Sequence, residues 1–399
     1  MKQRDTYLNR LLEVKDTSLI KVITGVRRCG KSSLLDLLEA HLLAAGVPGN
    51  RIIRMNFELL EFDSIREYKA LHQAVIDRLP PEGKVYVLLD EVSFVSEWER
   101  AVNSLRLHAQ LDIYITGSNA YLLASELSTL LAGRYIEIPM LPLSFKEFLD
   151  FNDLHQSGDV QGYFNLYLER GGLPGVTELR AQESAIRQYI NGIYHTIILK
   201  DVIARNEVRD PALLESVVRY LAGNVGNLVT SKKISDFLTS SGRKTASGTI
   251  DNYLRMLENA YVFYRAGRFD VKGKQQLKTQ GKYYIVDTGI RGGLVGQRGQ
   301  DYGFVLENLV YFELLRRGFD VKIGSIGGLE VDFIAQKPEK TLYVQVTATM
   351  LSEETQVREL RPLRAIPDYH EKLVLSMDRT PLNDFDGIRN VNLVDFLLA

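Results

Sequence analysis

The sequence of 399 residues has little of several features that would narrow its function at once. It contains a single cysteine, Cys29, so no disulfide can form within the chain, and its six histidines lack the spacing of zinc ligands. No apolar run reaches membrane-spanning length, and residues 1–18 are polar where a signal peptide needs an apolar core. We therefore expect a cytoplasmic protein with no membrane association and no zinc site.

The chain also lacks an excess of charge of either sign. Its 49 basic and 50 acidic residues leave a formal net charge of −1, so any nucleic-acid-binding surface must be local. Internal repeats and low-complexity segments are absent from the sequence as well. The length exceeds that of one typical domain and predicts two to four domains.

What the sequence does contain, from residue 19 to about 140, is a regular alternation of β-rich and helical runs. The predicted strands are "LIKVIT", "RIIRMNF", "KVYVLLD", "LDIYITG" and "RYIEIPM". Such alternation predicts an α/β fold with a parallel sheet and helices on both faces. The first strand is followed by a tight loop and then by the helical run "KSSLLDLLEAHLLAAG".

That loop, "GVRRCGKSS" at residues 25–33, matches the complete phosphate-binding loop. Its glycines let backbone N–H groups face the phosphates, Lys31 reaches the β and γ phosphates, and Ser32 can be a ligand of Mg²⁺. The alternative is a basic turn between a strand and a helix. We expect the thiol of Cys29 to be inert. The alternative is that its oxidation controls nucleotide binding. The predicted ATP-binding residues are Gly25, Val26, Arg27, Arg28, Cys29, Gly30, Lys31, Ser32 and Ser33.

Polar residues follow two of the other predicted strands. Asp90 would hold the magnesium ion, and Glu91 would accept the proton of an attacking water, as in a hydrolase rather than a nucleotide kinase. Thr116, Ser118 and Asn119 leave a buried strand where a sensor of the γ phosphate could sit. The alternative for Asp90 and Glu91 is a solvated acidic strand end. The alternative for Thr116, Ser118 and Asn119 is an ordinary turn.

Together with "LAGRYIEIPMLPLSFKEFL" and "GGLPGV", these motifs resemble the AAA+ -type ATPases of bacteria and archaea that carry a C-terminal restriction-endonuclease-like domain of unknown function. The resemblance covers nearly the whole chain. It implies that another strand lies between those bearing Lys31 and Asp90, and that Glu91 is catalytic. It also singles out Arg134, which could stabilise a transition-state phosphate in its own subunit or in a neighbour within a homo-oligomer, although an ordinary surface ion pair is the alternative.

The remainder of the chain predicts three further parts. After an ATPase domain at residues 1–145, residues 146–212 are expected to form a helical lid or linker, and residues 213–290 read as helices followed by a hairpin, which suggests a winged helix. Residues 228–282 contain eleven basic and four acidic residues, a local excess that predicts contact with double-stranded DNA. The alternative is a lid or a surface for a protein partner.

Residues 291–399 resemble a PD-(D/E)XK-like nuclease core. Glu307 on a helix and Asp332 on a strand match that pattern, whereas Gln345 replaces the second acid and Thr347 the lysine. We therefore expect a degenerate nuclease site without cleavage activity. The combined hypothesis is an ATPase that uses magnesium and rearranges the winged helix and this domain on nucleic acid. An ATP-dependent protein-binding switch and an ATP-gated nuclease are the alternatives.

Overall fold

The computed structural model describes residues 2–117, 131, 133–154, 158–179, 182–273, 275–296, 302–379 and 384–399, and it describes the side chains of these residues except 276–279. The chain divides into two compact units. The first contains the residues up to Pro142 together with Asn259–Tyr261, and the second contains Leu143–Glu258 and Val262–Ala399. Among the described residues, none of the helices combines the length and apolar character needed to cross a bilayer.

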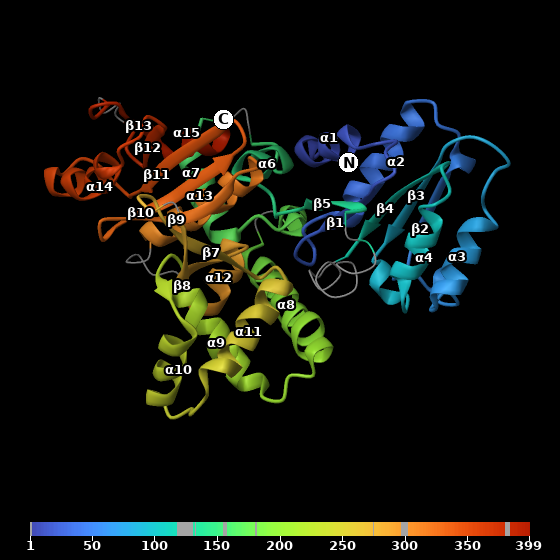
Figure 1. Ribbon diagram of the computed structural model, residues 1–399, viewed down its shortest axis with the longest axis horizontal. Coiled ribbons are helices and arrows are strands. Elements are labelled where there is room, and N and C mark those ends of the chain that lie inside the picture. Colours follow the sequence, from blue (N-terminus) through green and yellow to red (C-terminus); the bar gives the residue numbers. More distant parts are fainter. Residues whose placement is uncertain are drawn as a thin grey trace. The chain divides into compact units, whose positions relative to one another are not determined.

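The first unit is built on a parallel sheet of β1 (Ile20–Thr24), β2 (Ile52–Asn56), β3 (Val85–Asp90), β4 (Leu111–Thr116) and β5 (Tyr135–Pro139) (Figure 1). Its strand order within the described residues is β2-β3-β4-β1-β5. The five predicted strands are confirmed, and β4 lies between β1 and β3, as the resemblance implied. Every residue of β3 and β4 is buried, which explains why these strands appear in the sequence as nearly continuous apolar runs.

Helices cover both faces of this sheet (Figure 1). They are α1 (Asp5–Glu13), α2 (Lys31–Ala44), α3 (Tyr68–Ile76) and α4 (Trp98–Leu105), with short 3₁₀ turns at Gly49–Arg51, Leu60–Phe62 and Val92–Phe94. The right-handed connections of parallel strands place α2 on the face opposite α3 and α4, because the chain reverses its direction across the sheet at β2. Because the strands are parallel, the carboxyl ends of all five lie at one edge of the sheet. The loop before α2 lies at this edge, and so does the predicted site.

The second unit begins with helices. They are α6 (Phe145–Phe151), α7 (Val160–Arg170), a 3₁₀ segment (Pro174–Leu179), α8 (Glu183–Thr196), a π-helical continuation (Ile197–Ala204), α9 (Pro211–Gly223), α10 (Ser231–Ser240) and α11 (Ser247–Asn259). The predicted hairpin follows as β7 (Phe263–Asp270) and β8 (Gln275–Ile285), and the short β6 (Leu228–Val229) pairs with β8. The helices and the hairpin from which a winged helix was predicted are therefore present, and the winged helix itself stays a prediction.

The hairpin continues into a mixed sheet. After α12 (Thr288–Val295) and α13 (Tyr302–Arg316), the chain forms β9 (Asp320–Ile326), β10 (Leu329–Lys337), β11 (Lys340–Val346), α14 (Glu353–Ala365), β12 (Glu371–Ser376), β13 (Ile388–Asn392) and α15 (Leu393–Leu398). The described strands follow the order β13-β12-β11-β10-β9-β7-β8-β6. Because β7 pairs in parallel with β9, one sheet joins the segments predicted as separate domains at 213–290 and 291–399. The predicted four-part division stays a prediction.

Candidate functional site

The loop between β1 and α2 is wound around the side chain of Lys31. Its ammonium is buried and donates hydrogen bonds to the carbonyl oxygens of Gly25, at 3.1 Å, and Val26, at 3.3 Å. Gly25 has a φ of +140°, and a Cβ atom there would lie 2.1 Å from the carbonyl oxygen of Met140, so only glycine fits. Gly30, with a φ of +105°, precedes the first turn of α2. The loop geometry thus requires glycine at position 25 and favours it at position 30, and the loop carbonyl oxygens hold the ammonium of Lys31.

Arg4 fixes this loop from the N-terminal segment, which sequence reasoning missed. The side chain is buried, and its Nη1 donates to the carbonyl oxygens of Cys29, at 2.9 Å, and Leu141, at 3.0 Å. Its Nη2 donates to the carbonyl oxygen of Pro142 at 3.4 Å. The arginine therefore connects the loop to the segment that follows β5. No local pattern indicates it, because its partners are backbone atoms distant in the sequence.

The other residues of the loop differ in exposure. Val26 and Cys29 are buried, and burial raises the pKa of the Cys29 thiol, which agrees with an inert cysteine. Arg27 lies 3.7 Å from the carboxylate of Glu58, and Arg28 is exposed with a φ of +66°. At the start of α2, Ser32 is half-buried and Ser33 is exposed. No structural feature distinguishes Arg27 or Arg28 as a phosphate ligand, so both stay predictions.

Asp90 and Glu91 lie at the carboxyl edge of the sheet, and Thr116 connects them. The Thr116 hydroxyl donates to Asp90 Oδ1 at 2.5 Å and accepts from the Glu91 backbone N–H at 2.8 Å. Glu91 has a φ of +52°, a left-handed conformation that is unusual for a residue with a side chain and that is common at functional sites. Its Oε1 is 3.9 Å from Lys31 Nζ. The structure thus brings the predicted lysine, aspartate, glutamate and threonine together.

Burial tunes the acidity of Glu91. Its side chain is almost completely removed from water, and this desolvation raises its pKa above the ordinary value, although the positive charge of Lys31 acts in the opposite direction. A carboxylate with a raised pKa is a stronger base, as proton abstraction from water requires.

Arg54 of β2 is a second residue that sequence reasoning missed. Its Nη2 lies 3.0 Å from Asp36 Oδ1 and 3.2 Å from Asp90 Oδ2, and 3.5 Å from the Ser32 carbonyl oxygen. The side chains of Ser32 and Asp90 offer the hard oxygen ligands that Mg²⁺ prefers, so these residues fit the ion. Arg54 therefore contacts the carboxylate of Asp90 and the backbone carbonyl oxygen of Ser32.

Arg134, another predicted catalytic residue, does not lie beside Lys31. Arg134 precedes β5, whose first residue pairs with Ile20 at the start of β1, so it lies at the edge of the sheet opposite the phosphate loop. Its Nη1 donates to Asn103 Oδ1 of α4 at 3.2 Å. A role of Arg134 within its own subunit is therefore not supported, and a role in a neighbouring subunit stays a prediction. Asn119 and Ser118 lie outside the described residues.

The second unit holds a buried cluster of charges where the degenerate nuclease site was predicted. Lys282 of β8 is 3% exposed, and its Nζ lies 2.8 Å from Glu307 Oε1, 2.8 Å from Glu330 Oε1 and 3.6 Å from Asp332 Oδ1. Tyr284 donates to the same Glu307 oxygen at 2.6 Å. Glu307 and Asp332, predicted from the sequence, are thus brought together around Lys282, which belongs to the segment predicted to form a basic surface. Because it is buried, Lys282 does not belong to such a surface.

The two substituted positions also lie at this cluster. Gln345 Oε1 accepts from the Asp332 backbone N–H at 2.7 Å, and its Nε2 donates to Glu359 at 2.8 Å. Thr347 lines a cavity of about 680 Å³ together with Lys282, Glu307 and Asp332. Among the described residues, no group of three or more acidic, histidine or cysteine side chains has the geometry to hold a metal ion. Lys282 occupies the centre of this group of carboxylates.

Other lysines that could have reached this site are engaged elsewhere. Lys322 pairs with Asp320 at 2.7 Å, and Lys340 pairs with Glu371 at 2.8 Å. Lys372 donates to a backbone carbonyl oxygen at 2.7 Å, and Lys337 lies over the Phe319 ring. The lysine at the cluster comes from the hairpin, a connection that no spacing in the sequence indicates.

The cluster predicts a pH dependence of stability. Burial raises the pKa of Asp332 to about 8 in the folded protein, whereas in the unfolded chain this carboxyl has its ordinary pKa of about 3.8. Because the folded state keeps this proton to a higher pH, the contribution of Asp332 to the free energy of unfolding falls as pH rises from about 4 to about 8. We expect Asp332→Asn to flatten this decrease, measured as urea midpoints across that range. An equal slope in the variant and the parent would contradict the assignment.

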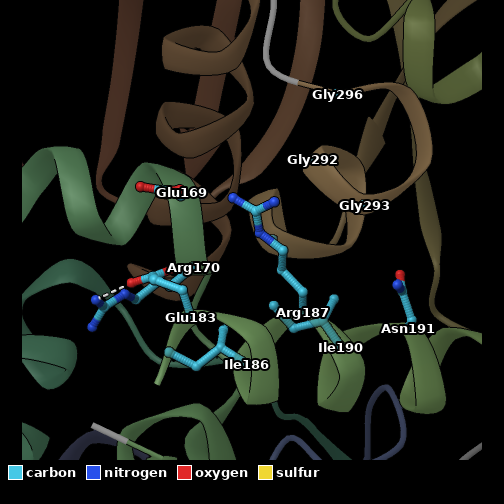
Figure 2. A pocket seen from close by; sticks show the side chains of 11 residues that line it. Glu169, Arg170, Glu183, Ile186, Arg187, Ile190, Asn191, Gly292, Gly293 and Gly296 are labelled. Carbon is cyan, nitrogen blue, oxygen red and sulfur yellow. Dashed lines mark hydrogen bonds and ion pairs between the residues drawn. The ribbon is translucent and has the colours of Figure 1, made fainter. Parts of the chain in front are cut away.

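A further cavity of about 350 Å³ lies among α7, α8 and α12. Arg187 of α8 extends toward the glycine-rich α12, and Arg170 pairs with Glu183 (Figure 2). The cavity is lined by both acidic and basic side chains and has no phosphate-binding loop. We therefore place the nucleotide at the loop before α2 and not here.

Comparison with known proteins agrees with this site. Residues 17–149 match the family described as "AAA domain", and residues 161–301 match a domain of unknown function, DUF8612. The chain is similar in fold to the Walker-type ATPase of Pyrococcus abyssi, with a TM-score of 0.53 and 16% identity over 74% of this chain and 96% of that one. This likeness supports the fold of a P-loop ATPase.

Two relatives cover most of the chain. An "Uncharacterized protein" of Haemophilus influenzae is 42% identical over 400 residues, which span 100% of this chain and 99% of that protein. An uncharacterized protein of Methanocaldococcus jannaschii is 29% identical over 90% of this chain and 82% of its own length. The chain therefore belongs to the same family as its H. influenzae relative, and its residues 17–149, which contain the phosphate loop, Asp90 and Glu91, match an AAA domain.

Proposed function

We propose that this protein hydrolyses ATP with Mg²⁺. The observation that carries the proposal is the position of Glu91, which is buried, held in a left-handed conformation and placed 3.9 Å from the ammonium of Lys31. Glu91 accepts the proton of the attacking water, and Thr116 fixes its backbone beside Asp90. An ATP-binding switch without hydrolysis would not need a buried base at this position.

Each residue of the site has a separate role in this proposal. Lys31 and the backbone N–H groups of the loop bind the phosphates and stabilise the charge that develops on them. Ser32 and Asp90 would hold the magnesium ion, which neutralises charge on the β and γ phosphates when it is bound. Arg134 would act on the nucleotide of a neighbouring subunit.

We further propose that hydrolysis rearranges the winged helix and the degenerate nuclease-like part of the second unit on double-stranded DNA. The support is the local excess of basic residues at 228–282. The exposed basic residues described there are Lys232, Lys233, Arg243, Lys244, Arg255, Arg265 and Lys272. Cleavage is not part of the proposal, because Gln345 and Thr347 stand where the nuclease pattern has a second acid and a lysine. A protein-binding switch is the competing function.

The DNA proposal predicts a salt-dependent loss of binding. Replacing Lys232, Lys244 and Lys272 by alanine should weaken the binding of a duplex of any sequence, because their exposed ammonium groups would contact phosphates. The slope of log K against log salt should become shallower by about 0.9 for each lost contact, or roughly 3 at most. Fluorescence anisotropy with a labelled duplex at several salt concentrations measures both quantities.

Exposed basic residues outside this segment provide the matched control. Replacing Lys146, Lys200 and Arg361 removes the same charge from the chain and should leave the slope unchanged. Equal effects of the two triple variants would show attraction without a defined surface. The absence of duplex binding by the parent protein would favour the protein-binding switch.

A further inference from the structure

Both oxygens of the Asp90 carboxylate are engaged in the structure. Asp90 is fully buried, its Oδ1 accepts from Thr116 at 2.5 Å, and its Oδ2 lies 3.2 Å from Arg54 Nη2. Among the described residues, Arg54 is the basic side chain that forms an ion pair with Asp90. A buried carboxylate is costly unless it is paired, so the arginine supplies the positive charge that this position requires.

Three elements hold Arg54 in place. It lies in the middle of β2, between Ile53 and Met55, and its Nη2 also contacts Asp36 of α2 at 3.0 Å. The ion pair with Asp36 does not involve Asp90, so the guanidinium keeps one carboxylate partner if it loses the other. In contrast, its Nη1 is buried and has no hydrogen-bond acceptor among the residues that the structure describes. Within this described part of the chain, the arginine is anchored through Nη2 alone.

We propose that Arg54 is the resident counter-ion of Asp90, which holds this carboxylate while no divalent cation is present and releases it when nucleotide enters with magnesium. The inference rests on the proposed function, because it takes Asp90 as the magnesium ligand. Arg54 Nη2 and a magnesium ion would compete for the same oxygen, Oδ2, since Oδ1 is held by Thr116. Arg54 is thus a positioning residue for the cation site.

Removing this positive charge should affect nucleotide binding differently with and without magnesium. In Arg54→Ala, the carboxylate of Asp90 has no counter-ion, so it repels the ionised phosphates of ATP that enters without a metal. When magnesium accompanies the nucleotide, the ion itself neutralises the carboxylate. A residue that only stabilised the fold would weaken binding equally in both conditions.

The test is the dissociation constant of a fluorescent N-methylanthraniloyl derivative of ATP, measured in EDTA and in excess Mg²⁺. We expect Arg54→Ala to bind on the order of tenfold more weakly in EDTA and within about threefold of the parent in Mg²⁺. Arg54→Lys keeps the positive charge, so its dissociation constant in EDTA should lie between those of the parent and of Arg54→Ala. The matched control is Arg78→Ala, because this exposed arginine donates to the backbone oxygen of Ala74 and its loss should change neither constant.

A double variant separates charge from structure. Arg54→Ala combined with Asp90→Asn removes the repelling carboxylate as well, and it should restore binding in EDTA to within about threefold of the parent. An equal loss in both conditions, or no recovery in the double variant, would overturn the counter-ion role alone. If the parent protein bound the nucleotide in neither condition, the proposed function would fail first, and this inference with it.

Discussion

Replacing Glu91 by glutamine should abolish ATP turnover and leave ATP binding intact. The amide keeps the size of the side chain and removes the proton acceptor, so we expect a loss of roughly 10²–10⁴-fold in turnover. The dissociation constant should change little, because Lys31 and the loop backbone hold the phosphates. Phosphate release at saturating ATP and the binding of a fluorescent ATP derivative measure the two quantities separately.

Lys31→Ala provides the contrast to this variant. The ammonium now bonded to the carbonyl oxygens of Gly25 and Val26 is the group that would meet the β and γ phosphates, so its loss should remove binding and turnover together. Ordinary turnover in Glu91→Gln would show that another group accepts the proton. A loss of binding in Glu91→Gln would instead indicate that the residue holds the loop in shape.

Replacing Lys282 by methionine should strongly destabilise the second unit. The substitution leaves Glu307 and Glu330 without the ammonium that lies 2.8 Å from each, and breaking a buried ion pair in this way typically costs about 3–5 kcal/mol of unfolding free energy. Protonation of the carboxylates removes their repulsion, so the deficit should shrink as pH falls. Urea unfolding at several pH values measures both effects.

The single tryptophan makes it possible to locate this loss. Trp98 lies in the first unit, so its emission reports on that unit, whereas far-ultraviolet circular dichroism reports on the helices of both. We expect the dichroism transition to move and the tryptophan transition to stay. The control Lys322→Met removes a more exposed ion pair and should cost less than about 1 kcal/mol. A similarly small cost in Lys282→Met would show that the cluster contributes little to stability.

The parts of the site that the sequence predicted are those set by local pattern. The phosphate loop has glycines at two fixed positions before a helix. Asp90 is the last residue of a strand that is buried along its whole length, and Glu91 directly follows it. Such features depend on neighbouring residues, so spacing and hydrophobicity are enough to find them. The strand order, with β4 between β1 and β3, came from the resemblance to a family and not from the pattern itself.

The residues that were missed act through contacts between distant parts of the chain. Arg4 bonds to backbone oxygens, Arg54 reaches two other elements from a strand, and Lys282 comes from the hairpin to carboxylates on α13 and β10. In the sequence each is one arginine or lysine among 49 basic residues. The pairing of β7 with β9 was missed for the same reason, because periodicity identifies strands without identifying their partners.

The measurement that tests the account most directly is phosphate release from ATP by the purified chain, with Mg²⁺ and with EDTA, beside the Lys31→Ala variant. The account predicts turnover that saturates with ATP, requires Mg²⁺ and disappears in Lys31→Ala, because the ammonium and the cation both act on the transferred phosphate. Phosphate release that continues in Lys31→Ala, or no release by the parent chain with and without duplex DNA, would contradict it.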